Sequence, residues 1–118
     1  MGREVSATDL RMDYEITPEE VKMMLDRGEQ CMLLDVREPW EFGAARIDGA
    51  TLIPMGDIPA RAYQELDPEV HIVVICHHGV RSMSVTAWLR QQGFEEAQSM
   101  RGGIDAWSRR VDAKVSLY

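Results

Sequence analysis

The sequence predicts an α/β domain in which a mostly parallel sheet carries helices on both faces. Its strongest strand signal is the run 71–76, which is β-branched and apolar on both faces, as in a central parallel strand. Shorter apolar runs of strand length lie at 31–36 and 52–53. Segments of helical pattern separate these runs, and such alternation is typical of a parallel sheet between helices.

The helical segments have recognisable starts and ends. Thr17 can cap a helix that begins at Pro18, Glu20 can return a bond to the Thr17 amide, and Gly28 is a stop signal. Further helices are predicted over 39–43, 58–66, 82–92 and 104–110. No repeat or linker interrupts the series, so we predict one domain over residues 13–118, preceded by an arm over residues 1–12.

Length and composition agree with this fold class. The 118 residues are 45% hydrophobic and 28% charged, the balance of an ordinary globular protein. No apolar run approaches the roughly 18 residues that a bilayer-spanning helix needs. The first residues also lack the apolar segment of a signal peptide, and we therefore expect a cytoplasmic protein with no membrane partner.

Charge and cysteine content exclude other classes. The formal net charge of −7 argues against a nucleic-acid partner, because phosphate contacts need a basic surface. Cys31 and Cys76 are too few for a disulfide framework, and without a Cys-x-x-Cys pair they predict no zinc site. Residues 70–94 contain no Asp or Glu but hold all three histidines and Cys76, a distribution that would favour anions there.

Cys76 is the candidate nucleophile. It ends the strongest strand, and open α/β sheets bind ligands at that edge. Gly79 lets the next residues curl so that backbone amides face the sulfur, and Arg81 and the following helix start would stabilise a thiolate. The alternative is an inert buried cysteine. We favour the nucleophile, with its sulfur ionised and open to solvent.

The loop Cys76-His77-His78-Gly79-Val80-Arg81-Ser82 resembles the active-site loop of the rhodanese-like sulfurtransferases. Segments 33–42, 49–54 and 101–107 resemble the same family, in family order. The resemblance implies a rhodanese domain with about five strands. It further implies that Cys76 is catalytic, that residues 77–82 bind the substrate, and that Asp35 and Arg37 brace the active-site edge.

The implied reaction is sulfur transfer through a persulfide on Cys76. The donor would be a small anionic sulfur compound, thiosulfate or a persulfide. The acceptor would be cyanide or a thiol, on a small molecule or a protein, and no cofactor is expected. Related dual-specificity phosphatases carry a Cys-x5-Arg loop, whereas Cys76 and Arg81 are spaced as Cys-x4-Arg, which favours sulfur over phosphate chemistry. A non-catalytic module that binds a partner or senses redox state through Cys76 is the alternative.

For several other residues the sequence gives less evidence of a functional role. Adjacent histidines such as His77 and His78 rarely ligate one ion well, so we predict no metal. Cys31 is expected to be a buried small residue rather than a resolving thiol. Residues 45–50 depart from the family's Gly-His-Ile-Pro-Gly-Ala and lose its histidine. Gly102 and Gly103 are expected to make a tight turn that could border the site mouth.

Overall fold

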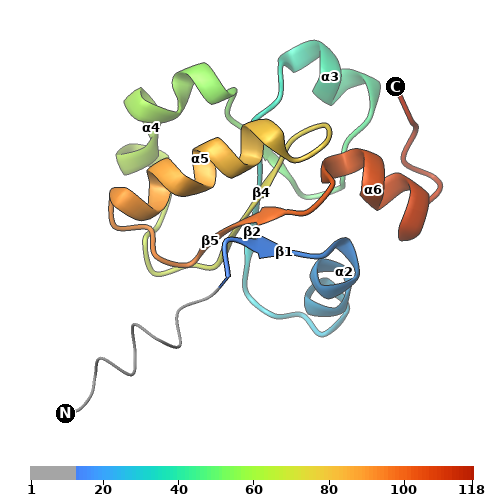
Figure 1. The fold of residues 1–118 in the computed structure, drawn as a ribbon, viewed down its shortest axis with the longest axis horizontal. Helices are drawn as coiled ribbons and strands as arrows, with labels where there is room; N and C mark the ends of the chain where they lie inside the picture. Colours follow the sequence, from blue (N-terminus) through green and yellow to red (C-terminus); the bar gives the residue numbers. More distant parts are fainter. Residues whose placement is uncertain (1–12) are drawn as a thin grey trace.

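A computed structural model describes residues 13–118, and the predicted arm over residues 1–12 lies outside this part (Figure 1). The described residues form a five-stranded sheet in the order β1-β5-β4-β2-β3. Every neighbouring pair is parallel. The strands are β1 (Glu15–Ile16), β2 (Met32–Asp35), β3 (Thr51–Leu52), β4 (Ile72–Ile75) and β5 (Ala97–Met100). The predicted α/β class is confirmed.

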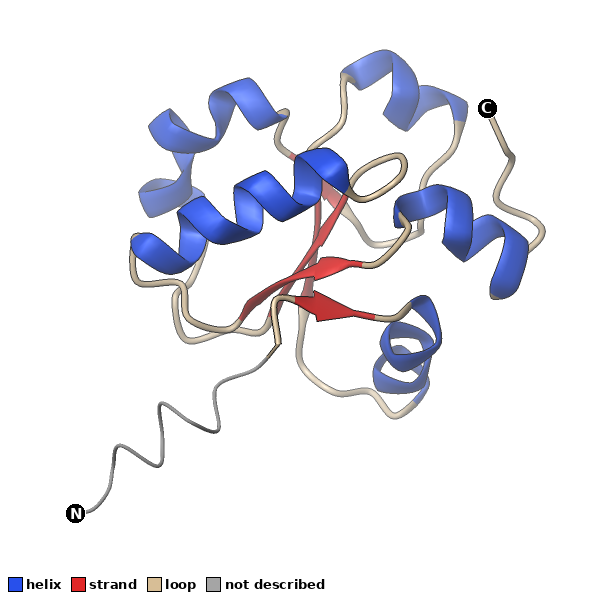
Figure 2. Cartoon of the chain, in the orientation of Figure 1, coloured by secondary structure: helices blue, strands red, loops and turns tan. Residues whose placement is uncertain are grey.

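Helices alternate with these strands and cover the sheet on both faces (Figure 2). They are α2 (Pro18–Asp26), α3 (Pro39–Ala44), α4 (Ile58–Glu65), α5 (Val80–Gln91) and α6 (Gly103–Arg110), with a 3-10 turn, η1, at Met55–Asp57. The capping box at Thr17 and Glu20 is present, as predicted. Within residues 13–118, no helix has the length and apolarity to cross a membrane.

Two apolar layers sandwich the sheet because neighbouring strand residues point to opposite faces. On one face Leu34 and Val74 pack with residues of α4 and α5. On the other face Leu33 and Val73 pack with residues of α2 and α6. This double burial explains the continuous apolar run at β4, whose four residues are all buried.

Strand β5 escaped prediction because its sequence, Ala-Gln-Ser-Met, is half polar although all four residues are buried. The polar side chains find partners inside the protein. Gln98 Nε2 donates to the Asp13 carbonyl at 2.9 Å, and the Ser99 and Ser82 hydroxyls lie 2.7 Å apart. Burial with satisfied hydrogen bonds is compatible with a central strand but leaves no apolar pattern to read.

The parallel arrangement places the candidate residues at one edge. Strands β2 and β4 pair in register from Met32 with Ile72 to Asp35 with Ile75. Cys76 and Asp35 therefore lie at the carboxyl edge of the sheet. Cys31 precedes β2 at the opposite edge, about 15 Å away along the strands, so it is not placed to resolve a persulfide on Cys76.

Candidate active site

The Cys76 loop runs directly from β4 into α5. Gly79 is the residue before the helix and has φ +108°, a conformation that L side chains rarely adopt. This turn directs the Gly79 N–H at Cys76 Sγ, at 3.0 Å. A Cβ at Gly79 would also lie 3.3 Å from the Gly102 nitrogen, so the turn favours glycine and the packing leaves little room for a side chain.

A pair of buried hydroxyls reaches the same sulfur. Cys76 Sγ lies 3.3 Å from Ser82 Oγ, which lies 2.7 Å from Ser99 Oγ. A thiol donates to Ser82, whereas a thiolate can accept from the Ser82 hydroxyl while Ser82 accepts from Ser99. The pair can therefore satisfy either charge state of the sulfur by rotating hydroxyl protons.

The expectation of a sulfur open to solvent is wrong, since only 1% of Cys76 is exposed. Tight packing beneath the loop and against the sheet edge accounts for this burial. Within residues 13–118, the backbone donor to Sγ is the Gly79 amide alone rather than a full ring of amides. A sulfur-donating substrate therefore reaches Cys76 Sγ only if the loop or its neighbours shift.

Arg81 forms an ion pair with Glu41, a partner that the sequence did not predict. Its two terminal nitrogens donate to Glu41 Oε1 and Oε2 at 2.7 and 2.8 Å. Glu41 is 4% exposed, and it also accepts from the Tyr118 hydroxyl at 2.8 Å. The Arg81 hydrogen bonds hold the pKa of Glu41 down, from 4.5 to about 2, and Glu41 in turn raises the pKa of Arg81. Arg81, which was expected to stabilise the thiolate, is thus held in an ion pair with Glu41.

Asp35 and Arg37 form a fully buried ion pair. Arg37 donates to both carboxylate oxygens of Asp35, at 2.8 and 2.7 Å, and to the Ala45 carbonyl at 2.6 Å. Its remaining terminal nitrogen donates to the Glu41 carbonyl at 3.2 Å and to the Tyr118 hydroxyl at 2.9 Å. The side chain therefore ties β2, α3 and the last described residue together, which is the geometry of a brace.

His77 and His78 stack on each other with ring centroids 3.9 Å apart. His77 also stacks on Tyr118, at 4.0 Å and nearly parallel. Burial lowers the pKa of His77, and the neighbouring His78 lowers it further. His78 Nε2 lies 3.9 Å from a carboxylate oxygen of Asp105, whose other oxygen accepts from Arg109. His77, His78 and Asp105 bring three possible ligand atoms within 4.8 Å of one another, and the absence of a metal stays a prediction.

The turn before α6 supports the loop from behind. Ile104 N–H donates to the Cys76 carbonyl at 2.8 Å, and Asp105 N–H donates to the His77 carbonyl at 3.1 Å. A Cβ on Gly103 would meet those two carbonyls closer than side chains ever approach. The tight turn at Gly102 and Gly103 is confirmed, and it packs directly against the loop.

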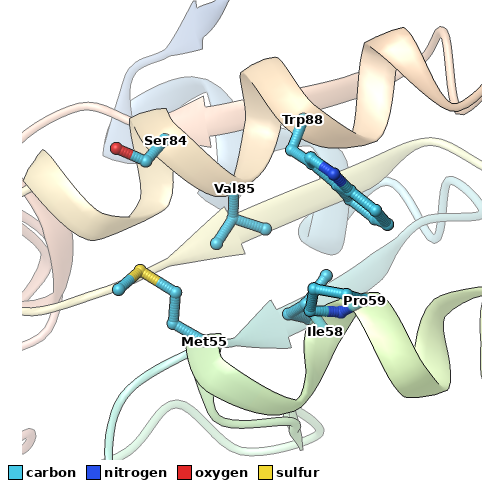
Figure 3. A pocket seen from close by; sticks show the side chains of 6 residues that line it. All are labelled: Met55, Ile58, Pro59, Ser84, Val85 and Trp88. Carbon is cyan, nitrogen blue, oxygen red and sulfur yellow. The ribbon is translucent and has the colours of Figure 1, made fainter.

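An apolar cavity lies further along α5 and is separate from the sulfur (Figure 3). Met55 and Pro59 line it from one side, and Ser84, Val85 and Trp88 line it from α5, as Figure 3 shows. None of its lining side chains titrates near neutrality, so it contributes no acid, base or nucleophile.

The structure thus brings four unanticipated side chains to the loop: Ser99, Glu41, Asp105 and Tyr118. Glu41 belonged to the segment 33–42 already singled out, and its position near Arg37 was the available signal. Asp105 likewise belonged to the segment 101–107, whereas Ser99 and Tyr118 have no local signal. Ser99 comes from a strand without strand pattern, and Tyr118 is 77 positions from Glu41.

Fold and site together define an α/β protein with a cysteine and an arginine-bearing loop at the carboxyl edge of a parallel sheet. The Rhodanese-like domain model matches residues 17–110. The chain belongs to this family. A rhodanese-like domain protein from Staphylococcus aureus has the same fold, with a TM-score of 0.77 at 29% identity over 90% of this chain and 99% of that one.

Relatives of similar length carry functional names. A sulfurtransferase of Allochromatium vinosum is 37% identical, over 83% of this chain and 91% of its own length. The thiosulfate sulfurtransferase GlpE of Pseudomonas aeruginosa is 34% identical, over 86% and 89%. Other relatives are longer, and the chain spans only 26% and 31% of two of them. The similarity supports a rhodanese-type sulfurtransferase in general terms.

Proposed function

We propose that the protein transfers a sulfane sulfur from thiosulfate or a persulfide to cyanide or a thiol through a persulfide on Cys76. The observation that carries the proposal is the position of Cys76 Sγ at the carboxyl edge of the sheet, hydrogen-bonded to Gly79 N–H and Ser82 Oγ. The names of the relatives of similar length support the same reaction class.

In the first step the Cys76 thiolate attacks the outer sulfur of the donor. A new S–S bond forms on Cys76 while the donor's S–S bond breaks, and sulfite or a thiolate leaves with the bonding electrons. The Gly79 amide and, after rotation of its proton, the Ser82 hydroxyl stabilise negative charge on the enzyme sulfur.

In the second step the acceptor attacks the outer sulfur of the Cys76 persulfide. The new bond is S–C for cyanide or S–S for a thiolate, and the Cys76 thiolate leaves and is ready for another cycle. The two steps exchange one bond to the transferred sulfur for another, with no net oxidation or reduction. The reaction therefore needs no redox cofactor.

The remaining residues of the loop have distinct positions in this proposal. His77 and His78 lie on the side of the loop that faces Asp105 and Tyr118. Val80 is 78% exposed and offers an apolar contact to a partner at the start of α5. Asp35 and Arg37, both fully buried, act as structural support rather than as substrate contacts.

Replacing Cys76 by Ser tests the proposal, with Cys31→Ser as the matched control at the opposite edge of the sheet. Cys76→Ser should abolish sulfur transfer from both donors to cyanide, while Cys31→Ser retains it. After donor treatment, mass spectrometry should find one added sulfur on Cys76. Turnover in the Cys76→Ser protein contradicts the proposal.

The same measurements separate the enzyme from the alternative of a non-catalytic module. A module that only senses redox state would accept a sulfur on Cys76 but pass none to cyanide or to a thiol. A cytoplasmic location stays a prediction, which cell fractionation can check.

A further inference from the structure

The positive charges closest to the Cys76 loop are already neutralised within the protein. Arg81 is bound by both oxygens of Glu41, at 2.7 and 2.8 Å, and the carboxylate is almost completely buried. Arg37, the other guanidinium at this edge, is held by Asp35 with neither side chain exposed. These two ion pairs leave no net charge to offer an incoming anion.

On the opposite side of the loop, arginines are likewise paired with carboxylates. Arg101, beside the Gly102 turn, pairs with Glu15 at 3.2 Å. Arg109 on α6 pairs with Asp105 at 2.9 Å, and Asp105 lies beside His78. Burial and the neighbouring His78 lower the pKa of His77, so His77 adds little positive charge at neutral pH. Within residues 13–118, each of these four arginines around the loop faces a carboxylate.

Backbone dipoles add positive potential at the sulfur, beside the Coulombic interaction that Arg81 retains with Cys76. The start of α5 supplies about half an elementary charge, and the Gly79 N–H points at Sγ. Such a field can stabilise one negative charge on Cys76. It is small against the three negative charges that gather when a thiolate attacks the thiosulfate dianion.

We propose that the Glu41–Arg81 ion pair makes this site selective for a donor of low charge, a persulfide, over the thiosulfate dianion. The inference rests on the proposed function and narrows its donor class. Glu41 is the specificity-determining residue, and the Tyr118 hydroxyl, which donates to Glu41 at 2.8 Å, is its positioning residue.

The favoured reaction balances without any further reactant. The Cys76 thiolate attacks the outer sulfur of R–S–SH, the donor's S–S bond breaks, and R–S⁻ leaves. One S–S bond is exchanged for another, and the single negative charge moves from Cys76 to the departing thiolate. The proton remains on the transferred sulfur.

The test compares two donors with cyanide as the shared acceptor. One donor is thiosulfate, and the other is the persulfide of N-acetylcysteine methyl ester, whose only ionisable group is the persulfide. In Glu41→Gln, Arg81 loses its counter-charge, so the ratio of kcat/KM for thiosulfate to kcat/KM for the persulfide should rise about tenfold or more. The change in this ratio is diagnostic because the two donors differ in intrinsic reactivity.

Glu65→Gln is the matched control. It removes the same charge from an exposed carboxylate that binds Arg61 on α4, away from the loop, and should leave the ratio as in the parent. A Glu41→Gln ratio indistinguishable from that of Glu65→Gln overturns the inference. The Cys76→Ser variant distinguishes a failure of this inference from a failure of the proposed function, because sulfur transfer that survives in that variant refutes the proposed function itself.

A measurement on the unsubstituted protein covers the case in which Glu41→Gln does not fold. With a neutralised loop and a net charge of −7, the protein repels the dianion more strongly than the persulfide. The kcat/KM for thiosulfate should therefore rise with ionic strength, because salt screens repulsion. A fall with ionic strength would reveal an uncompensated cation that attracts thiosulfate, and it would overturn the inference.

Discussion

The Tyr118 hydroxyl donates a hydrogen bond to Glu41 Oε2 at 2.8 Å and joins two residues 77 positions apart. The Tyr118 hydroxyl oxygen in turn accepts a hydrogen bond from Arg37 Nη1 at 2.9 Å. One phenol thus lies between the buried brace at Arg37 and the carboxylate that binds Arg81. Its ring stacks on His77, so the segment after α6 is attached to the Cys76 loop through both the ring and the hydroxyl.

Tyr118→Phe should destabilise the protein by about 1–2 kcal/mol, because two hydrogen bonds with charged partners are lost while the ring remains. Tyr14→Phe is the control, since the Tyr14 ring lies over the Arg90 guanidinium and keeps that contact without its hydroxyl. Urea unfolding of the three proteins measures the difference. Equal stability of Tyr118→Phe and the parent would show that the bridging hydroxyl contributes nothing.

Acid should weaken the protein through Glu41. The folded-state pKa of Glu41 is lowered from 4.5 to about 2, first by hydrogen bonds from Arg81, so the unfolded chain binds the proton more readily. The resulting stability is present above pH 4.5 and is lost as pH falls toward 2; it amounts to at most about 3 kcal/mol. Tyr118 and the Glu38 amide also donate to this carboxylate.

The measurement is the free energy of unfolding between these two pH values for the parent and for Glu41→Gln. The two curves should converge as the pH falls toward 2, because protonation removes from the parent what the substitution removes from the variant. Curves that stay parallel through this interval would assign the acid sensitivity to other carboxylates.

Gly103→Ala should be far more damaging than Gly28→Ala. Both glycines have positive φ, +63° and +70°, so both substitutions carry a backbone cost of about 1–2 kcal/mol. A Cβ at Gly28 meets nothing within 4 Å, whereas a Cβ at Gly103 collides with the Cys76 and His77 carbonyls. We expect Gly103→Ala to cost about 2 kcal/mol beyond Gly28→Ala, and to lose sulfur transfer as the loop shifts.

Thermal unfolding and the sulfur-transfer rate of the two glycine variants provide the comparison. The effect on activity is specific to Gly103, since Gly28 follows α2 far from the loop in the chain. Equal losses in the two variants would mean that the turn before α6 does not support the Cys76 loop.

Ser82→Ala should lower kcat/KM for sulfur transfer about tenfold, because the thiolate loses a hydroxyl donor worth about 1.5 kcal/mol or more. Ser84→Ala is the control: Ser84 lies two residues further along α5, is exposed and lines the apolar cavity instead. Ser99→Ala should have a smaller effect than Ser82→Ala, because Ser99 reaches the sulfur only through Ser82. An unchanged rate in Ser82→Ala would remove the hydroxyl pair from the mechanism.

Local sequence carried the prediction furthest where the pattern was repeated along several residues. The apolar run at 71–76 predicted β4, and the capping residues Thr17 and Glu20 predicted the start of α2. Strand β5 was missed because Gln98 and Ser99 are buried through hydrogen bonds rather than through apolar character. Strand β1 has two residues, too few for any period to be visible.

The sequence likewise predicted only part of the candidate site. Cys76, Gly79 and Ser82 are neighbours in the chain, and a strand-loop-helix sequence brings them together wherever that loop forms. The partner of Arg81 could not be predicted by the same reasoning. Glu41 lies 40 positions away and meets Arg81 only because β2 and β4 pair in parallel and place α3 beside the start of α5.

By itself, the order of residues determined the alternation of strands and helices and placed a candidate nucleophile at the end of the central strand, because both depend on interactions within a few positions. Tertiary structure alone decided how deeply the sulfur is buried and which carboxylates pair with the arginines around it. Burial and charge compensation depend on which distant segments pack together, and no local pattern in the chain encodes that.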